Sequence, residues 1–271
     1  MVSIIDALEK IKKKSNLNKT DANGFIIGGK WIFDKKENLS KCLVTSRLSR
    51  KVVAQSAQEN FKLIISIYPP IFTRGIEQRV NNEQLDLLKI IIENKIALYA
   101  LGEGWLVVED GGFDYLLDLL DFQYKSFFEL LISDRIGKEK KLFGRLGERK
   151  KKLKLNELLF LIQELVDQEI SYIGYNELPI KNVVIVNEIM NEDIILEIIY
   201  SKKTDLIIVG EITYEALLAA QLVKLPIVII GKRNLENIVI SKIRRNLLEE
   251  VTINLSDIII KKQDKIGSIY Q

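Results

Sequence analysis

The chain has 271 residues, 47% of them hydrophobic and 28% charged, and its 15 glycines and 4 prolines are too few for a disordered or linker-rich protein. The 40 lysines and arginines against 37 aspartates and glutamates give a formal net charge of +3, too small by itself to indicate nucleic-acid binding. The absence of histidine excludes Ser–His and Cys–His nucleophile pairs, and the single cysteine, Cys42, excludes an intramolecular disulfide.

The amino-terminal sequence lacks the apolar core of a signal peptide. No apolar run approaches the roughly 20 residues that a membrane span needs. We therefore expect a cytoplasmic protein with no membrane-spanning segment.

Hydrophobic periodicity predicts alternating helices and strands through the first part of the chain. Helices are expected at residues 3–15, with Ser3 as the cap, and at 49–60, 82–94 and 110–122; strands are expected at 24–33, 41–46, 62–67 and 96–101. This order favours a mixed sheet with flanking helices. Cys42 falls in the middle of a strand, which indicates a buried packing residue rather than a nucleophile.

The strand at residues 62–67 is the most informative of these elements. Its apolar run Leu63-Ile64-Ile65 is typical of a strand buried on both faces of a sheet, and Pro69-Pro70 must stop it. Ile67 and Tyr68 therefore lie at the carboxyl end of a strand, the edge at which open α/β sheets bind ligands. Isoleucine offers no chemistry there. Tyr68 offers a phenol, either as an acid or hydrogen-bond donor or as a locally packed ring.

A second alternating pattern begins near residue 125. It predicts strands at residues 127–132, 183–186, 205–209, 226–230, 251–253 and 258–260, and helices at 156–168, 192–200, 213–223 and 234–248. Two α/β halves of similar pattern indicate two α/β domains with mixed sheets and flanking helices.

Residues 138–154 carry a dense run of lysines and arginines. A solvated loop is favoured over a nucleic-acid or anion-binding patch, because Phe143 is the single aromatic residue there and stacking on bases needs several. A second charged segment holds Glu103, Glu109 and Asp110, for which a solvated loop is favoured over a site for a hard cation such as magnesium.

Several segments, in order along the chain, resemble the Nif-three-like family, whose members include GTP cyclohydrolase I type 2 homologues. The central family segment Leu-Ile-Ile-Ser-His-His-Pro-Leu-Ile-Phe is similar to Leu63-Ile64-Ile65-Ser66-Ile67-Tyr68-Pro69-Pro70-Ile71-Phe72. The other segments are Ile4-Ile5-Asp6-Ala7-Leu8, Asp21-Ala22-Asn23-Gly24, Ala97-Leu98-Tyr99-Ala100, Gly111-Gly112 with Asp114, Gly144-Arg145-Leu146-Gly147-Glu148, Val209-Gly210-Glu211-Ile212-Thr213-Tyr214 and Gly231-Lys232-Arg233-Asn234-Leu235-Glu236.

The resemblance implies a fold of two related domains. The first would hold residues 1–124 and 226–271, and the second residues 125–225. It also implies a homo-oligomer, expected as a homohexamer.

The family hallmark implied by the resemblance is a centre of two divalent metal ions. Its ligand positions fall at Ile67, Tyr68, Leu106, Lys232 and Glu236, so that only Glu236 keeps a ligand side chain. Apolar groups donate no lone pair and an ammonium repels a cation, and one carboxylate cannot hold two metals. We therefore expect a degenerate site with no bound metal, no cofactor and no catalytic residue.

Other roles for these residues stay open. Glu236 lies one helical turn after Lys232, which favours an ion pair between them over a relic ligand. Arg47, Lys232 and Arg233 follow strand ends and are candidates for an anion-binding site, although ordinary surface positions are favoured.

The resulting hypothesis is a non-catalytic oligomeric scaffold or a ligand-binding, regulatory protein. The alternative is a metal-dependent hydrolase of a nucleotide-like substrate, of the GTP cyclohydrolase I type 2 kind. A weaker alternative is nucleic-acid binding through the 138–154 basic segment.

Overall fold

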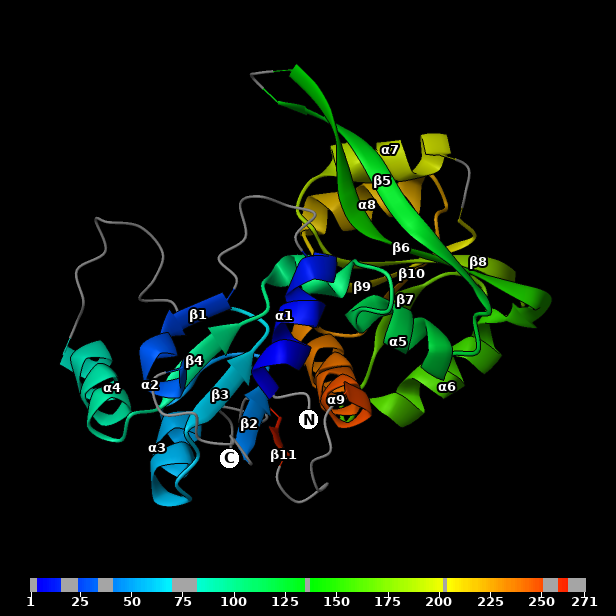
Figure 1. Cartoon of the computed structure of the whole chain (residues 1–271). Helices are drawn as coiled ribbons and strands as arrows, with labels where there is room; N and C mark the ends of the chain where they lie inside the picture. The colour runs from blue at the N-terminus through cyan, green and yellow to red at the C-terminus, as the bar shows by residue number, and fades with distance from the viewer. Residues whose placement is uncertain are drawn as a thin grey trace, which may run out of the picture. The chain divides into compact units, whose positions relative to one another are not determined.

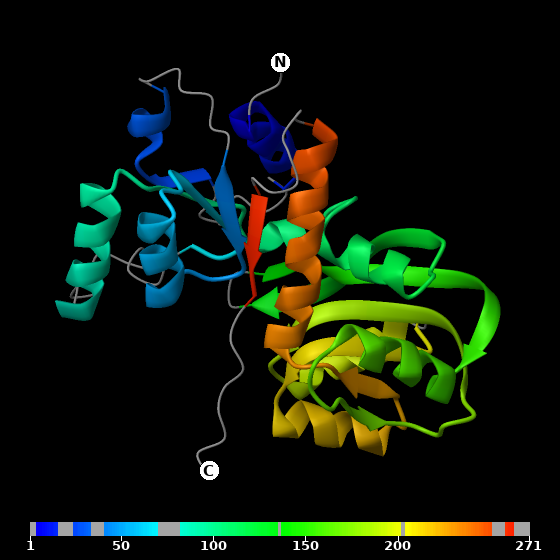
Figure 2. The ribbon, with the colours of Figure 1, turned by 90° about the horizontal axis from the view of Figure 1, so that it is seen from below.

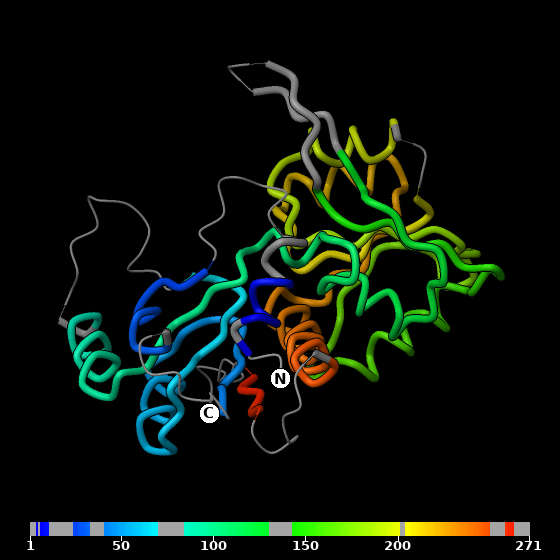
Figure 3. The backbone as a smooth tube through the Cα atoms, in the orientation of Figure 1, coloured from blue at the N-terminus to red at the C-terminus, as the bar shows by residue number. Residues whose placement is uncertain are grey.

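The computed structural model describes residues 4–15, 24–33, 41–69, 82–134, 137–201, 204–250 and 258–262. The chain forms two compact units, the first made of Met1–Trp105 and Ile240–Gln271 and the second of Leu106–Val239. Figure 3 follows the backbone through the first unit, into the second after the fourth strand, and back through one long helix. Residues 106–124 and 226–239, which the domain prediction assigned to the first domain, group with the second unit by their contacts.

The first unit contains a mixed sheet with flanking helices, as the sequence predicts, and the sheet has five strands. Its strands lie in the order β1-β4-β3-β2-β11. β2, β3, β4 and β11 are parallel to their neighbours, and β1 is antiparallel to β4. The bounds are β1 Gly24–Ile27, β2 Cys42–Thr45, β3 Leu63–Ser66, β4 Ala97–Ala100 and β11 Ile258–Lys261.

Helices cover both faces of this sheet, because its central strands are apolar on both sides. The helices that begin in this unit are α1 Ile4–Ser15, α2 Gly29–Phe33, α3 Arg50–Gln58 and α4 Asn82–Glu93. α3 and α4 pack on one face, and α1 and the carboxyl-terminal half of α9 (Lys232–Glu250) lie on the other (Figures 1 and 2). On the α1 side, the Tyr99 hydroxyl donates a hydrogen bond of 3.3 Å to the Leu8 carbonyl.

The second unit contains a six-stranded mixed sheet in the order β5-β6-β8-β9-β10-β7. β8, β9 and β10 are parallel to one another, and the remaining pairs are antiparallel. The bounds are β5 Tyr124–Asp134, β6 Gly137–Lys154, β7 Ser171–Ile173, β8 Pro179–Ile189, β9 Leu206–Ile212 and β10 Ile227–Ile229.

One core of the second unit lies between this sheet and two helices, α7 Glu192–Ser201 and α8 Tyr214–Leu222. Val184 and Val186 of β8 point into it with Ile207 and Val209 of β9, as expected from the two-residue period of a strand. The unit also contains α5 Gly112–Leu119 and α6 Leu155–Leu165, and the 3-10 helix η2, Glu103–Leu106, lies at the border between the units.

Two secondary-structure predictions are wrong for identifiable reasons. The strand expected at 24–33 ends at Gly28, whose φ of 75° lies in the left-handed region, and α2 follows. The basic segment 138–154 is not a loop: it lies entirely within β6, which pairs with β5 on one side and β8 on the other. The many charged residues hid the strand pattern in the sequence, although Gly144, Arg145 and Gly147 of this strand are buried.

β7 was missed because three residues, Ser171-Tyr172-Ile173, are too short to show a period. The Ser3 cap, Pro70 and the strand expected at 251–253 lie outside the described residues. Among the described helices, none is long and apolar enough to cross a membrane.

Candidate functional site

The carboxyl ends of β2, β3 and β4 form the first cluster of predicted site positions. The Tyr68 N–H donates to the Ser46 carbonyl at 3.1 Å, and the Gly102 N–H donates to the Ile67 carbonyl at 2.9 Å. The Ser66 hydroxyl donates to the Tyr68 carbonyl at 2.8 Å. These bonds extend the parallel pairing past the strand ends and fix the backbone of Ile67 and Tyr68.

The side chains of Ile67 and Tyr68 are both buried. The Arg47 guanidinium stacks on the Tyr68 ring, with Cζ 4.0 Å from the ring centroid. A cation over a tyrosine face is attracted by the negative face of the ring, and the contact strengthens as water is removed. Tyr68 is therefore a locally packed ring, and the positive charge of Arg47 lies over its face.

Leu106 ends η2, where it is buried beside the buried Trp105. Glu103 and Glu109 nearby in the sequence are exposed, as expected for a solvated loop. The Asp110 backbone N–H donates to the Asp114 carboxylate at 2.8 Å. Among the residues that the structure describes, no three His, Cys, Asp or Glu side chains gather closely enough to hold a metal ion.

The second cluster lies in the other unit, where β8, β9 and β10 end and α9 begins. The Lys232 ammonium contacts the Glu188 carboxylate at 2.6 Å. Glu188 belongs to β8, and its part in this contact was not foreseen from the sequence because the two residues are 44 positions apart. Glu236 is buried on α9 one turn after Lys232. The ion pair between Lys232 and Glu236 stays a prediction.

Two glycines allow this approach of strand and helix. A Cβ on Gly210 would lie 2.6 Å from the Asn187 carbonyl oxygen and 3.1 Å from the Lys232 Cα, so that no larger residue fits between β9 and α9. Gly231, with φ of 81°, turns the chain into α9, and its carbonyl accepts the Leu235 N–H at 3.0 Å. Arg233 follows at the amino end of this helix, where the helix dipole favours anions.

A third arrangement joins two segments that the sequence analysis quoted without assigning them a role. The Arg145 guanidinium donates to both oxygens of Asp114, from Nε at 2.6 Å and from Nη2 at 2.9 Å, and both side chains are buried. Its Cζ also lies 4.5 Å from the centroid of the Phe127 ring. Such a two-pronged pair fixes orientation as well as distance, so that Arg145 holds the start of α5 against β6.

Two further cations of the basic segment also have carboxylate partners, whereas Lys150, Lys151 and Lys152 are exposed on the same strand. Arg149 pairs with Asp121 at 2.8 Å and donates to the Leu120 carbonyl at 2.6 Å. Lys154 pairs with Glu177 at 2.6 Å.

Cys42 is fully buried in β2, and burial raises the pKa of its thiol to about 12. A thiol of this kind stays protonated and unreactive at neutral pH. The structure therefore agrees with a packing role for Cys42.

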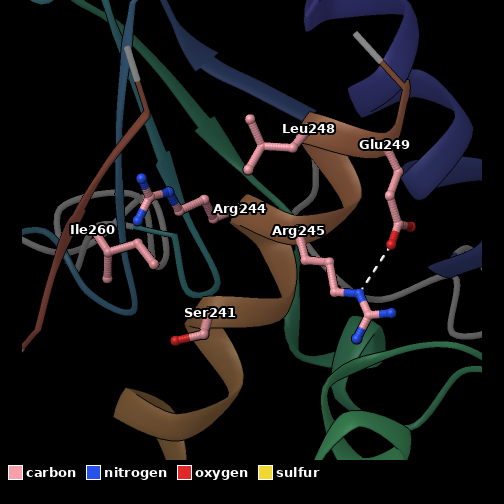
Figure 4. Close-up of a pocket in the computed structure, with 6 residues that line it drawn as sticks. All are labelled: Ser241, Arg244, Arg245, Leu248, Glu249 and Ile260. Atoms are coloured by element: carbon pink, nitrogen blue, oxygen red, sulfur yellow. Dashed lines mark hydrogen bonds and ion pairs between the residues drawn. The ribbon is translucent and has the colours of Figure 1, made fainter. Parts of the chain in front are cut away.

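A pocket in the first unit lies between the carboxyl-terminal half of α9 and β11 (Figure 4). Its volume is about 390 Å³, and Arg245 on its wall donates to Glu249 at 2.9 Å. None of the predicted site residues lines it. Its lining residues are Ser241, Arg244, Arg245, Leu248, Glu249 and Ile260.

Comparisons with known proteins agree with the family resemblance. The family Duf34/NIF3 (NGG1p interacting factor 3) matches residues 1–265. A protein of Clostridium perfringens named GTP cyclohydrolase 1 type 2 homolog is 26% identical over 268 residues, which cover 97% of this chain and 95% of that protein.

Solved structures show the same fold. A Bacillus cereus protein related to NIF3 superposes with a TM-score of 0.73 at 15% identity, covering 99% of this chain and 97% of the other. Reduced HcgD from Methanocaldococcus jannaschii superposes with a TM-score of 0.73 at 19% identity, covering 95% of each chain.

Proposed function

The chain belongs to the DUF34/NIF3 family over residues 1–265, and from this premise we propose that it is a non-catalytic member, an oligomeric scaffold or ligand-binding, regulatory protein with a degenerate metal site. The observation that carries the proposal is the state of the side chains at the positions where the family resemblance places metal ligands. Ile67 and Leu106 are apolar and buried, and Tyr68 is buried under the Arg47 guanidinium.

The same holds in the second unit. Lys232 brings a positive charge, and its ammonium already contacts Glu188. Each ion of a dinuclear centre requires several converging lone-pair donors, which Glu236 and one phenol do not supply. Without a metal or a histidine, these positions lack the two groups that most often activate water near neutral pH.

An anionic ligand is the ligand class that the charges favour. Arg47 stands at the strand ends of the first unit, and Lys232 and Arg233 stand at the start of α9. The Nη1 atom of Arg233 is buried and has no hydrogen-bond partner among the described residues. A buried donor without an acceptor costs free energy, and an anion would supply that acceptor. The expected ligand is therefore a phosphate or carboxylate compound.

Elemental analysis and a turnover assay test the loss of metal chemistry. We expect no stoichiometric zinc, iron or manganese in protein purified with and without added metal, and no GTP ring opening above background. A variant combining Ile67→His, Tyr68→His, Lys232→His and Leu106→Asp should gain metal affinity, because it returns lone-pair donors to the family positions. Two metal ions per chain in the unmodified protein would contradict the proposal.

Binding of inorganic phosphate and of GTP, measured by calorimetry, tests the ligand class. Arg233→Met keeps an unbranched apolar stem and removes the guanidinium donors, so it should weaken binding by roughly 10-fold or more. Lys150→Met, an exposed cation of β6, is the matched control. Equal binding by the two variants would remove Arg233 from the site.

A metal-dependent hydrolase of a nucleotide-like substrate is the second candidate. The name of the Clostridium perfringens relative supports it. GTP turnover that requires added metal and disappears in Glu236→Ala would establish this candidate in place of the first. Nucleic-acid binding is weaker, because Arg145, Arg149 and Lys154 of the basic segment are engaged by carboxylates.

A further inference from the structure

The outer side of α8 carries a line of exposed apolar side chains. Tyr214, Leu218 and Leu222 follow one another at four-residue spacing and are 68%, 40% and 84% exposed. Ala216 and Ala220 of the same helix are buried in the core. Surface helices normally turn polar residues to water. α8 exposes Glu215 and Gln221, but it exposes three large apolar side chains beside them, which makes this side of the helix a candidate for a covered surface.

The neighbouring helix extends this face. α7 and α8 pack on the same core, and Figure 1 shows them side by side over the sheet of the second unit. Leu196 and Tyr200 of α7 are 39% and 75% exposed, and Val223 just after α8 is 43% exposed. We call these three residues together with Tyr214, Leu218 and Leu222 the α7–α8 face.

The size of the α7–α8 face can be compared with that of known interfaces. With about 200 Å² for a large side chain that is fully exposed, the exposed fractions of the six residues amount to on the order of 700 Å². The largest apolar patch on a typical monomer is about 300–600 Å². One side of a stable protein–protein interface is about 800 Å². The face therefore supplies most of the area of one stable interface.

Charges at the two ends of the helices indicate how such an interface is arranged. Glu192 and Asp193 begin α7 and are exposed, and Glu215 is exposed in the first turn of α8. Exposed Lys224 follows the end of α8. A like helix packed antiparallel places each acidic end against a basic end, whereas parallel packing places like charges together.

We propose that a second copy of this chain covers the α7–α8 face through a two-fold axis, with α8 antiparallel to its counterpart. A two-fold interface uses the same patch on both subunits. Tyr214 and Leu222 at the two ends of one stripe meet the opposite ends of the other stripe, and Glu215 faces Lys224 of the partner subunit. This deepens the proposed function by assigning a surface to its assembly, and it rests on that part of the proposal alone.

Sedimentation equilibrium of the full-length chain over a range of concentrations is the test. The unmodified protein should form dimers or multiples of dimers. Leu222→Glu should raise the dissociation constant at this interface at least about 30-fold, the effect of losing a central interface anchor. Phe160→Glu, at an exposed aromatic residue on α6, is the matched control and should leave the mass unchanged. Far-UV circular dichroism should show that both variants are folded.

A charge exchange tests the antiparallel arrangement. Lys224→Glu alone should weaken association several-fold, because it places carboxylates together. The double variant Lys224→Glu with Glu215→Lys should restore it. A monomeric unmodified protein, or a Leu222→Glu protein that assembles as before, would overturn the proposal, and failure of the double variant to recover would overturn the antiparallel arrangement. Metal content and GTP turnover do not enter this measurement, so its failure is distinct from failure of the non-catalytic proposal.

Discussion

Removing the guanidinium of Arg145 should destabilise the second unit far more than removing an exposed cation of the same strand. Arg145 and Asp114 are both buried and share two short hydrogen bonds, of 2.6 and 2.9 Å. In Arg145→Met, the side chain keeps much of its volume. The Asp114 carboxylate loses both hydrogen bonds from Arg145 and keeps the one from the Asp110 N–H. An uncompensated buried charge of this kind costs about 3–5 kcal/mol of unfolding free energy.

The double variant separates the cost of the broken pair from the value of the intact one. Arg145→Met combined with Asp114→Leu places two apolar side chains where two charges were. Buried ion pairs replaced by apolar groups of similar volume are often close to neutral in stability. We therefore expect the double variant to recover most of the loss, short of about 1 kcal/mol for the Asp110 N–H that loses its acceptor.

Urea unfolding followed by far-UV circular dichroism measures these changes through the midpoint and slope of the transition. Lys154→Met is the matched control, because Lys154 lies on the same strand and its pair with Glu177 is exposed on both sides. We expect its midpoint to match that of the unmodified protein. The reasoning is refuted if Arg145→Met costs less than about 1 kcal/mol, or if the double variant is less stable than Arg145→Met alone.

Three further outcomes follow from single contacts. Lys232→Ala should lower the unfolding free energy by about 1–3 kcal/mol, because it leaves the Glu188 carboxylate without its ammonium partner. Lys150→Ala, at an exposed position, should leave the unfolding free energy unchanged. Equal thermal midpoints for the two variants would make residue 232 an ordinary surface group. Gly144→Ala would place a Cβ 2.2 Å from a backbone oxygen of β8, so it should destabilise by at least about 2–3 kcal/mol in the same urea assay; a stability within error of the unmodified protein would show that the strands can separate there. Because burial raises the pKa of the Cys42 thiol to about 12, the native protein at about pH 8 should resist iodoacetamide, while urea-unfolded protein should be fully alkylated by mass spectrometry; rapid native alkylation would count against a closed β2.

Much of the fold was predictable from local patterns in the sequence. The central strand β3 follows from an apolar run, and the helix α4 follows from the three- to four-residue spacing of its leucines and isoleucines; both are local signals. The burial of Cys42 follows from its place in one such run. The strand-end positions of Ile67 and Tyr68 follow from the prolines after them.

Other features became visible only in the tertiary structure. The lysines of residues 138–154 concealed β6, because its strand character comes from pairing on both sides rather than from its own apolar period. The exposed side of α8 was also undetermined, because its apolar residues are spread around the helix, with Glu215 and Gln221 as the only strongly polar ones, and so mark no single inward face in the sequence.

The charged contacts divide in the same way. The sequence determined that Arg145 and Lys232 occur beside glycines in family-like segments. Only the tertiary structure decided that Arg145 pairs with Asp114, 31 residues away, and that Lys232 contacts Glu188, 44 residues away. Helical and strand periods relate neighbours in sequence, whereas the partner of a buried charge is chosen by how strands and helices from distant segments pack together.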